Sequence, residues 1–377
     1  MNVCILFHKY LPNEGISVSI KRLIENVPSV NFHIITGKPN SSKLDLLKTQ
    51  INTRKEKNVY VHEVGFINKI NSDDYLDGLD NLSFAIQKLH KKYSFDLIHS
   101  YYLTPNGYVG TIVAKKLGIP SLVSIRGNDL GKNYLDYKRI FSIYWTIKNS
   151  DFLTFVNEDL LNLANIIYPC KKKSKLILNS CFFPLKQTIQ QKQVSKKLIF
   201  GYFGDIKRKK GLIYLLEAIA LIKNENFKVK LLGDINDAEK EIYKNYIQKL
   251  NIENKISLSK SISREKIPNW LSKIDVCVFP VIDDGCPNVI LEAIQLSKPI
   301  ISTNISAVSQ LLTNNKNSIL VEPRDSKDLA KGMQKIIKNP KLITKYSKSA
   351  QELVYTKLNV KTECGQFVQI YKQLKKR

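Results

Sequence analysis

Residues 274–304 read IDVCVFPVIDDGCPNVILEAIQLSKPIISTN and form the most informative stretch of this chain. A short apolar run ends at Pro280, a loop with two aspartates and a glycine follows, and an apolar segment opens at Pro287. A Lys-Pro pair closes that segment before a second apolar run begins at Ile300. Proline is favoured at the first position of a helix, because its missing N–H would have no partner there. The pattern predicts a strand, a loop, a helix and a strand, which is a βαβ unit of a parallel sheet.

The polar residues of the predicted helix share one face. Asn288, Glu292 and Gln295 follow one another at spacings of four and three, and the other positions are almost all apolar. Open α/β sheets bind ligands at the carboxyl ends of their strands, and a helix that starts there attracts phosphate. A carboxylate one turn into such a helix can accept hydrogen bonds from sugar hydroxyls. From the residues alone, a solvated Glu292 and an ordinary turn at Asp283 and Asp284 remain the alternative.

The sequence DGCPNVILE, from Asp284 to Glu292, resembles the acidic-x7-Glu signature of retaining, nucleotide-sugar-dependent glycosyltransferases. These enzymes form the glycogen-synthase-like group called family 4, or glycosyl transferases group 1. Their signature usually begins with Glu, whereas this chain has Asp284. The resemblance implies that Asp284 is a catalytic residue near the donor sugar and that Glu292 holds the ribose hydroxyls. It also implies a set of donor-binding residues between them, namely Gly285, Cys286, Pro287, Asn288 and Val289.

A second glycine-containing loop lies upstream of this signature. Residues 198–203 form an apolar run, residues 204–211 read GDIKRKKG, and residues 212–222 have the spacing of an amphipathic helix. Backbone N–H groups and the helix dipole in such a loop face an anion, and the lysines neutralise it. The loop is therefore a candidate phosphate cradle, with a solvated run of charges as the alternative.

This loop resembles the pyrophosphate loop of the same family. Gly204 opens it, and Lys210 matches the lysine that precedes the closing glycine. The family often has Arg after the first glycine, where this chain has Asp205. Lys207 and Arg208 are the candidates to replace that cation, and Arg208 is included in the predicted donor site.

Residues 96–130 resemble the acceptor-side half of the family, in which a His-Gly-x-Asp type of loop lies beside the reacting sugar. Here Arg126 stands where His is common, and Asp129 completes the loop. A guanidinium cannot act as a base, but it can clamp a carboxylate or a phosphate. Arg126 and Asp129 are thus predicted catalytic-site residues, with a helix-capping turn as the alternative. The family usually has a Gly-Gly pair near the donor phosphates, and this chain keeps only Gly15 of that pair. The alternative is that Gly15 is a glycine at the start of a helix with no role in binding.

The length and composition limit the class of protein. A chain of 377 residues is too long for one typical core, so we expect two domains. The hydrophobic content of 43% excludes global disorder. Six scattered cysteines without a C-x-x-C pair indicate a reducing cytoplasm and no structural metal. We expect the start, MNVCILF, to be a strand rather than a signal peptide, and no apolar run approaches the ~20 residues that span a bilayer.

The net charge of +26 requires a hypothesis about partners. An anionic membrane, a nucleic acid or a phosphorylated substrate would each fit, and a general bias toward Lys, Asn and Ile is the alternative without function. The sequence lacks an RNP-like aromatic motif, zinc-finger spacing and a helix-turn-helix pattern, so we expect no nucleic-acid partner. We expect the polar, lysine-rich residues 41–58 to be a solvated loop, and contact of this segment with an anionic inner leaflet is the functional alternative.

The resemblance extends over the whole chain and implies the GT-B architecture, with two Rossmann-like, doubly wound α/β domains facing each other across a cleft. Residues 1–183 would form the acceptor-binding domain and residues 184–197 the linker. Residues 198–355 would form the domain that binds the nucleotide-sugar donor. Residues 356–377 would form a last helix that packs back toward the N-terminal domain.

The expected activity is the transfer of a sugar from a nucleotide diphosphate sugar, with UDP as the favoured nucleotide, to a saccharide or lipid-linked acceptor. The resemblance implies retention of the anomeric configuration, no cofactor and no metal, and it suggests cell-envelope polysaccharide as the product. Two alternatives remain open. One is a nucleotide-sugar epimerase of the same shape, and the other is a basic adaptor without catalytic activity.

Overall fold

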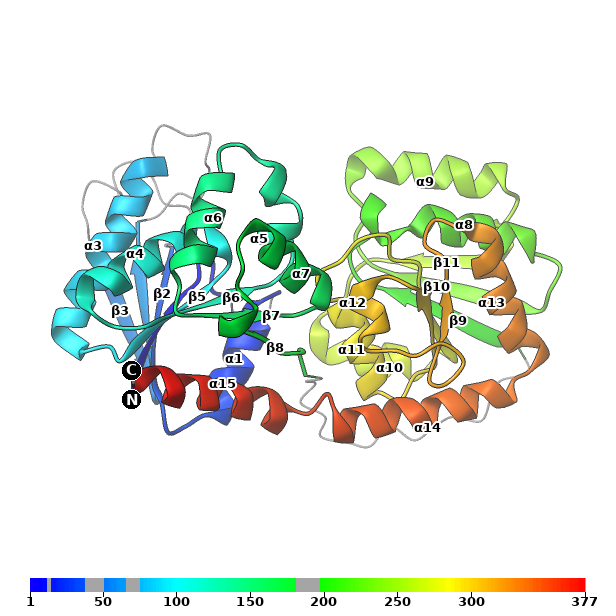
Figure 1. The fold of residues 1–377 in the computed structure, drawn as a ribbon. Helices are drawn as coiled ribbons and strands as arrows, with labels where there is room; N and C mark the ends of the chain where they lie inside the picture. Colours follow the sequence, from blue (N-terminus) through cyan, green and yellow to red (C-terminus); the bar gives the residue numbers. More distant parts are fainter. Residues whose placement is uncertain (12–14, 38–50, 66–74, 181–196, 377) are drawn as a thin grey trace. The chain divides into compact units, whose positions relative to one another are not determined.

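The computed structural model describes residues 1–11, 15–37, 51–65, 75–180 and 197–376. The chain divides into two compact units (Figure 1). Unit 1 comprises Met1–Asn179 together with Val360–Arg377, and unit 2 comprises Ser180–Asn359. The C-terminal segment thus belongs to the unit that also contains the N-terminus. Almost all of the predicted linker, residues 184–197, lies outside the described residues.

Unit 1 is built on an eight-stranded sheet with the order β3-β4-β2-β1-β5-β6-β7-β8. All neighbouring strands are parallel except β3, which is antiparallel to β4. The strands are β1 (Asn2–Leu6), β2 (Asn31–Gly37), β3 (Ile51–Glu56), β4 (Val59–Val64), β5 (Leu97–Tyr101), β6 (Ser121–Ile125), β7 (Phe152–Phe155) and β8 (Ser174–Leu176). The helices are α1 (Ser17–Asn26), α3 (Tyr75–Tyr93), η1 (Leu103–Gly107), α4 (Tyr108–Leu117), α5 (Asn128–Gly131), η2 (Asn133–Leu135), α6 (Ile140–Asn149), α7 (Glu158–Ile167), η3 (Lys171–Lys173) and α15 (Val360–Lys375).

Both faces of the central part of this sheet are covered, which explains why strands such as β1, β5, β6 and β7 are buried along almost their whole length. On β1, Val3 and Ile5 point into a core shared with α1 and α15. Their neighbours Cys4 and Leu6 point to the opposite face, into a core shared with α3 and α4. This alternation along one strand makes β1 a central, fully buried strand.

The edge strand β3 was not expected, because residues 41–58 were predicted to be a loop. Residues 51–56 instead pair with β4, and residues 41–50 lie outside the described residues. Nearly every side chain of β3 is exposed, so the segment has no apolar face by which a strand is recognised. Cross-strand contacts stabilise it instead, including an ion pair of 2.6 Å between Arg54 and Glu63.

Unit 2 is a six-stranded, fully parallel sheet with the order β11-β10-β9-β12-β13-β14. Its strands are β9 (Leu198–Phe203), β10 (Phe227–Leu232), β11 (Ile256–Ser259), β12 (Val276–Phe279), β13 (Ile300–Thr303) and β14 (Ile319–Val321). Its helices are η4 (Arg208–Lys210), α8 (Leu212–Leu221), α9 (Asp237–Lys249), η5 (Glu253–Lys255), η6 (Arg264–Lys266), α10 (Ile267–Leu271), α11 (Asn288–Gln295), α12 (Ser306–Ser309), α13 (Ser326–Lys338) and α14 (Lys341–Thr356).

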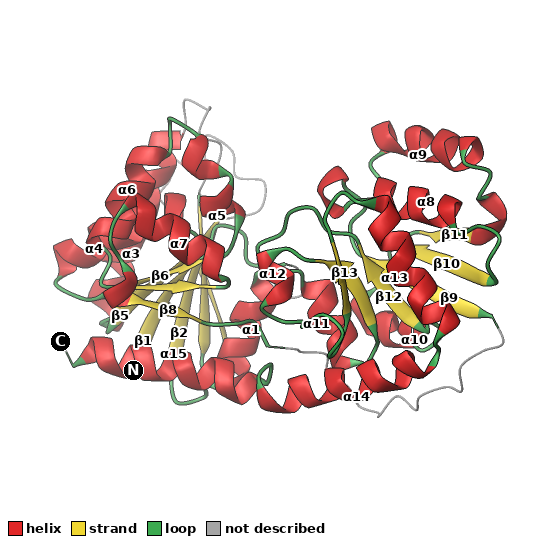
Figure 2. Cartoon of the chain, turned by 45° about the vertical axis from the view of Figure 1, so that its right-hand side comes forward, coloured by secondary structure: helices red, strands yellow, loops and turns green. Residues whose placement is uncertain are grey.

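The strand order of unit 2 reverses between β9 and β12. From β9 the chain runs outward to β10 and β11, and it then returns to the other side of β9 to add β12, β13 and β14. This is the doubly wound arrangement, and Figure 2 shows helices around the sheet. The loops that follow β9 and β12 meet at the point of reversal, where open α/β sheets form their ligand sites. These two loops are the ones that the sequence predicted to bind the donor.

Candidate functional site

The loop between β12 and α11 sits directly behind a buried strand. All four residues of β12 are buried, and α11 begins at Asn288, so Pro287 is the N-cap rather than the first helical residue. Pro287 itself makes no side-chain hydrogen bond to cap the helix. The N-terminal N–H groups of a helix carry a partial positive charge that favours an anion. The start of α11 is therefore suited to bind an anionic group.

The loop after β9 is fastened to the loop after β12. The backbone carbonyl of Lys209 accepts hydrogen bonds from the N–H groups of Ile282 and Asp283, at 2.9 and 3.4 Å. Gly211 has a φ of 74°, and a Cβ on it would lie 1.8 Å from the carbonyl oxygen of Pro280. Only glycine fits this left-handed and crowded position. The packing of the two loops thus depends on the glycine that closes the GDIKRKKG segment.

This packing brings together two residues that the sequence assigned to different motifs. The ammonium group of Lys210 forms an ion pair with the carboxylate of Asp284. Their side chains are only 19% and 15% exposed. A cation and a carboxylate thus lie side by side at the reversal point of the sheet. The pair holds the Lys210 ammonium group in a fixed position, where it can contact a further anion.

Two other predicted residues meet at the same place. Gly204 has a φ of 116°, and a Cβ on it would lie 3.0 Å from Cγ1 of Val289 in the first turn of α11. The backbone at the end of β9 therefore approaches the start of α11 closely. Cys286 lies in the loop between β12 and α11, is partly exposed and is not in a disulfide.

Arg208 lies apart from the ion pair. It lines a groove of about 510 Å³ together with residues that follow β9 and β10, among them Lys207 and Asp234. Asp205, at the position where the family often has Arg, pairs with Lys207 at 2.6 Å on the surface. Asp234 accepts a hydrogen bond of 3.1 Å from the N–H of Ser261. The basic loop therefore has two sides, with Lys210 on the side of α11 and Arg208 on the side of β10.

The sequence did not predict the partner of Glu292. Its carboxylate Oε1 accepts a hydrogen bond of 2.9 Å from the guanidinium of Arg264 in η6. The Glu292 side chain is 12% exposed, and burial raises the pKa of its carboxyl group while the charge of Arg264 opposes this rise. Arg264 lies in a different part of the chain, and nothing in its local sequence indicates the pair. We regard Arg264 as a component of the site that sequence reasoning missed.

In unit 1, Asp129 binds backbone N–H groups of the loop in which it lies. Its Oδ1 accepts hydrogen bonds from the N–H groups of Arg126 and Gly127, at 3.0 and 2.8 Å, and its Oδ2 accepts one of 3.2 Å from the N–H of Leu103. Burial raises the pKa of Asp129 to about 6, although these hydrogen bonds oppose the rise. The residue therefore fixes the backbone after β6 against the backbone after β5.

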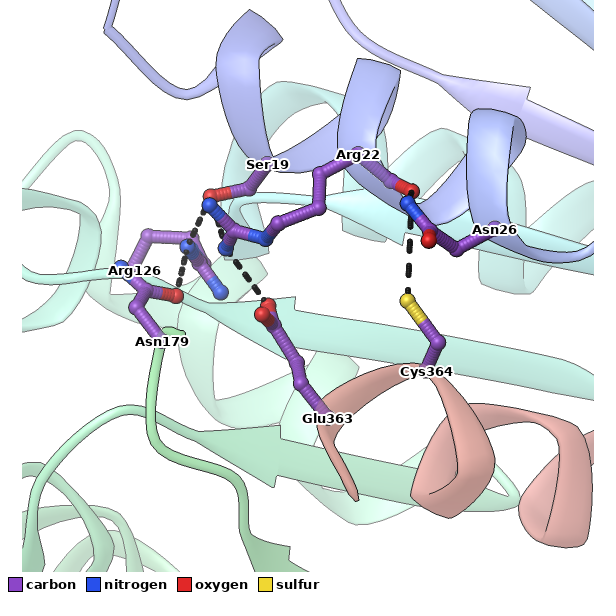
Figure 3. A network of polar contacts seen from close by, with 7 residues as sticks. All are labelled: Ser19, Arg22, Asn26, Arg126, Asn179, Glu363 and Cys364. Atoms are coloured by element: carbon purple, nitrogen blue, oxygen red, sulfur yellow. Dashed lines mark hydrogen bonds and ion pairs between the residues drawn. The ribbon is translucent and has the colours of Figure 1, made fainter. Parts of the chain in front are cut away.

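The guanidinium of Arg126 belongs to a buried polar network (Figure 3). It donates hydrogen bonds of 3.1 Å to the Ser19 hydroxyl and of 2.7 Å to the side-chain oxygen of Asn179. Next to it, Arg22 of α1 forms an ion pair of 2.8 Å with Glu363 of α15, and both side chains are 5% exposed. The same Arg22 donates a longer hydrogen bond of 3.3 Å to Ser19. Arg126 is thus held by residues from distant segments, which the sequence did not predict to meet.

Two residues lie in the loop after β1. Gly15 has a φ of 49°, and a Cβ on it would have no described heavy atom within 4 Å, so it adjoins open space near the start of α1. His8 stacks on Tyr102 with ring centroids 5.6 Å apart, and burial together with the charge of Lys9 lowers the pKa of His8 to about 4. Its Nδ1 has no hydrogen-bond partner in the described part of the chain. The imidazole is neutral at pH 7 and was not singled out from the sequence.

Two known families match this chain in succession. Residues 32–178 match the family described as Glycosyl transferase 4-like, and residues 186–353 match the family described as Glycosyl transferases group 1. The chain is built from two glycosyltransferase domains. The fold prediction of two doubly wound GT-B domains is confirmed.

Relatives of this glycosyltransferase cover most of its length. An uncharacterised glycosyltransferase of Methanocaldococcus jannaschii is 26% identical and covers 87% of this chain and 86% of its own. The UDP-Gal:α-D-GlcNAc-diphosphoundecaprenol α-1,3-galactosyltransferase of Escherichia coli is 24% identical and covers 76% of this chain and 78% of its own. The solved structure of Anabaena HepE in complex with UDP matches with a TM-score of 0.78 at 17% identity, over 99% of this chain and 100% of HepE.

Proposed function

We propose that this chain transfers a sugar from a UDP-sugar to a saccharide or lipid-linked acceptor, with retention of the anomeric configuration. The bond between the anomeric carbon and the β-phosphate oxygen breaks, and a bond to the acceptor hydroxyl oxygen forms. UDP leaves, and the hydroxyl proton is released. The retaining family 4 mechanism is part of this proposal, and it rests on the resemblance of the segment from Asp284 to Glu292.

The junction of the two donor-site loops is the observation that carries the proposal. Lys210 and Asp284 lie in contact in the loops that lead to the start of α11, where the N-cap Pro287 makes no side-chain hydrogen bond. The departing UDP develops negative charge on its β-phosphate. A fixed ammonium group and preorganised N–H groups lower the energy of such a charge, by an amount often worth several kcal/mol. We assign this role to Lys210 and to the backbone N–H groups of Gly285, Cys286, Asn288 and Val289, and we propose that these groups act in place of a metal. Pro287 has no N–H to donate, and it sets the start of α11 instead.

The remaining donor residues take roles that follow from their positions. Gly204 allows the chain to approach the start of α11, and Arg208 offers a second cation on the groove beside β10. Glu292 would accept a hydrogen bond from a ribose hydroxyl on Oε2, since its Oε1 already accepts one from Arg264. Each of these assignments can be tested by a single substitution.

In unit 1, we propose that Arg126 orients an anionic group of the acceptor or donor. The Asp129 carboxylate would keep the Arg126 backbone in place rather than contact the sugar, because three N–H groups already bind it. His8 follows β1 and is neutral at pH 7, and it would accept a hydrogen bond from a sugar hydroxyl; its lowered pKa makes it too weak a base to take up the acceptor proton.

The relatives support the choice of substrates. The name of the Escherichia coli relative gives UDP-galactose as donor and a lipid-linked diphosphate sugar as acceptor, and the solved HepE structure contains UDP. We therefore propose that the product belongs to a cell-envelope polysaccharide such as capsule or lipopolysaccharide, with no nucleic-acid partner. The sugar transfer would take place in the cytoplasm, at the inner face of the plasma membrane. Within the described ranges, none of the helices combines the length and hydropathy that crossing a bilayer needs.

A panel of nucleotide sugars tests this proposal. A ligand that binds only the folded protein raises its melting temperature, so UDP-sugars should stabilise the chain more than the matching GDP-sugars. Product analysis by NMR with the stabilising donor should then show a glycoside with the donor's anomeric configuration. A free epimerised nucleotide sugar without acceptor would identify an epimerase. The absence of binding by every nucleotide would favour the adaptor.

A further inference from the structure

Exposed apolar side chains gather on one short segment of unit 1. Among the described residues, twelve large hydrophobic side chains are more than a third exposed, and four of them lie between residues 135 and 141. Leu135 is 77% exposed, Tyr137 81% and Phe141 65%, and Ile140 lies between them at 37%. Single exposed apolar residues need no explanation, but a cluster marks an interaction surface.

This segment is held in a defined conformation. Asp136 accepts hydrogen bonds from the N–H of Lys138 at 3.0 Å and from Nε of Arg139 at 3.1 Å. On the helix that follows, Ile143 and Ile147 are buried in the unit, whereas Phe141 and Lys148 lie on the exposed side. The apolar side chains outside the core are therefore displayed by an anchored turn and helix start.

The same segment is basic. Residues 132–150 contain four Lys or Arg and a single carboxylate, Asp136, which is paired with Arg139. Lys132, Lys138 and Lys148 are exposed around the apolar side chains. An apolar centre surrounded by lysines matches a surface that has negative charges outside and hydrocarbon beneath, which is an anionic bilayer.

The position of the segment in the fold fits this partner. It begins directly after α5, which follows the Arg126 loop at the carboxyl end of β6 (Figure 1). The hydroxyl of Ser142 in α6 donates a hydrogen bond of 3.4 Å to Thr104 in the segment after β5. The exposed segment thus adjoins the edge of the sheet to which the proposed reaction assigns the acceptor.

We propose that residues 132–141, here called the 132–141 patch, dock unit 1 onto an anionic lipid bilayer. Leu135, Tyr137 and Phe141 enter the boundary between headgroups and acyl chains, where tyrosine is favoured. Lys132 and Lys138 contact the anionic headgroups. The inference goes beyond the proposed reaction, because docking needs neither donor nor acceptor. It adds a defined surface to the expectation of membrane contact, which the sequence had placed at residues 41–58.

Co-sedimentation of the full chain with vesicles tests the patch. The vesicles are phosphatidylcholine alone or phosphatidylcholine with phosphatidylglycerol, at low and high salt. The test variant is L135S/Y137S/F141S. The matched control is L221S/I242S/Y355S, which removes side chains that are 56%, 65% and 73% exposed on unit 2. UDP binding and the melting temperature of each variant show whether the fold is kept, and a charge variant, K132Q/K138Q, keeps the apolar residues.

The wild type and the control variant should bind the anionic vesicles and release them at high salt. The test variant should bind about tenfold less, and the charge variant should lose mainly the difference between anionic and neutral vesicles. Equal binding by test and control variants would overturn the proposal, and so would a wild type that binds neither kind of vesicle. A wild type that self-associates through the patch, seen as a change of mass in the test variant alone, would assign the surface to a second copy instead. Failure here leaves UDP binding unaffected, so the two proposals can be separated.

Discussion

Replacing Arg264 by Met should destabilise unit 2 in a pH-dependent manner. The substitution leaves the carboxylate of Glu292 without its 2.9 Å partner in a position that is 12% exposed. Loss of one partner of a fully buried ion pair costs about 3–5 kcal/mol. Arg264 is 26% exposed and water can reach the gap, so we expect a loss of about 2 kcal/mol in unfolding free energy at pH 7.

The sign of the pH effect follows from the pKa of Glu292. Burial already raises this pKa, and removal of Arg264 removes the charge that opposes the rise. When the folded-state pKa of a carboxyl lies above its unfolded-state pKa, the folded protein gains stability as the pH falls and the carboxyl becomes protonated. The loss of unfolding free energy caused by Arg264→Met should therefore shrink as the pH falls from 7 to about 5. Urea unfolding at the two pH values measures this difference.

A double variant and a control complete the experiment. Arg264→Met with Glu292→Met removes both charges and should return to within about 1 kcal/mol of the wild type. Lys244→Met breaks a pair with Glu241 whose side chains are 63% and 66% exposed, and it should cost no more than about 0.5 kcal/mol. A loss for Arg264→Met that equals this control, or that is the same at both pH values, would refute the account of the pair.

Two further predictions concern backbone packing and acid stability. Gly211→Ala should destabilise unit 2 by at least about 2 kcal/mol and abolish UDP binding, because the φ of 74° at Gly211 and the nearby Pro280 carbonyl exclude a Cβ. An unchanged affinity for UDP in calorimetric titration would contradict this prediction. Burial, with the charge of Arg126, lowers the pKa of His99 to about 3. Below about pH 6.5 the unfolded state therefore binds a proton at His99 that the folded state does not bind. The free energy of unfolding should fall as the pH drops from about 6.5 toward 3. His99→Gln should reduce that slope by about one proton in urea titrations across this range, and an unchanged slope would argue against a neutral His99.

The donor-site loops could be predicted because their information is local. The order of strand, loop and helix around Pro287 follows from spacing within some thirty residues, and so does the position of Gly204 before a basic loop. In a parallel sheet, the carboxyl ends of strands share one edge, so two loops in different parts of the chain were expected to meet. The contact between Lys210 and Asp284 is consistent with this reasoning.

The parts that escaped prediction depend on contacts between distant segments. Arg264 and Glu292, or Arg22 and Glu363, have no local pattern that links them. Asp129 looks the same in sequence whether it caps a turn or contacts a sugar, and only its three N–H donors distinguish the roles.

Local structure was misjudged at β3. Residues 51–56 carry almost no apolar side chain, so the alternation that predicts a strand is missing from their sequence. Their pairing with β4 is visible only in the structure.

Calorimetric titration of UDP into the wild type and into Lys210→Ala determines whether Lys210 binds the pyrophosphate of a UDP-sugar. Lys207→Ala serves as the matched control, because Lys207 lies in the same loop but is 62% exposed and paired with Asp205. A charge-assisted hydrogen bond of about 2 kcal/mol corresponds to a loss of about 30-fold in affinity. We predict that loss for Lys210→Ala under conditions in which the variant is folded, and a much smaller loss for Lys207→Ala. The melting temperature of Lys210→Ala without ligand should also fall, because Asp284 loses its partner in a position that is 15% exposed. Equal affinity of the wild type and Lys210→Ala for UDP would contradict the account.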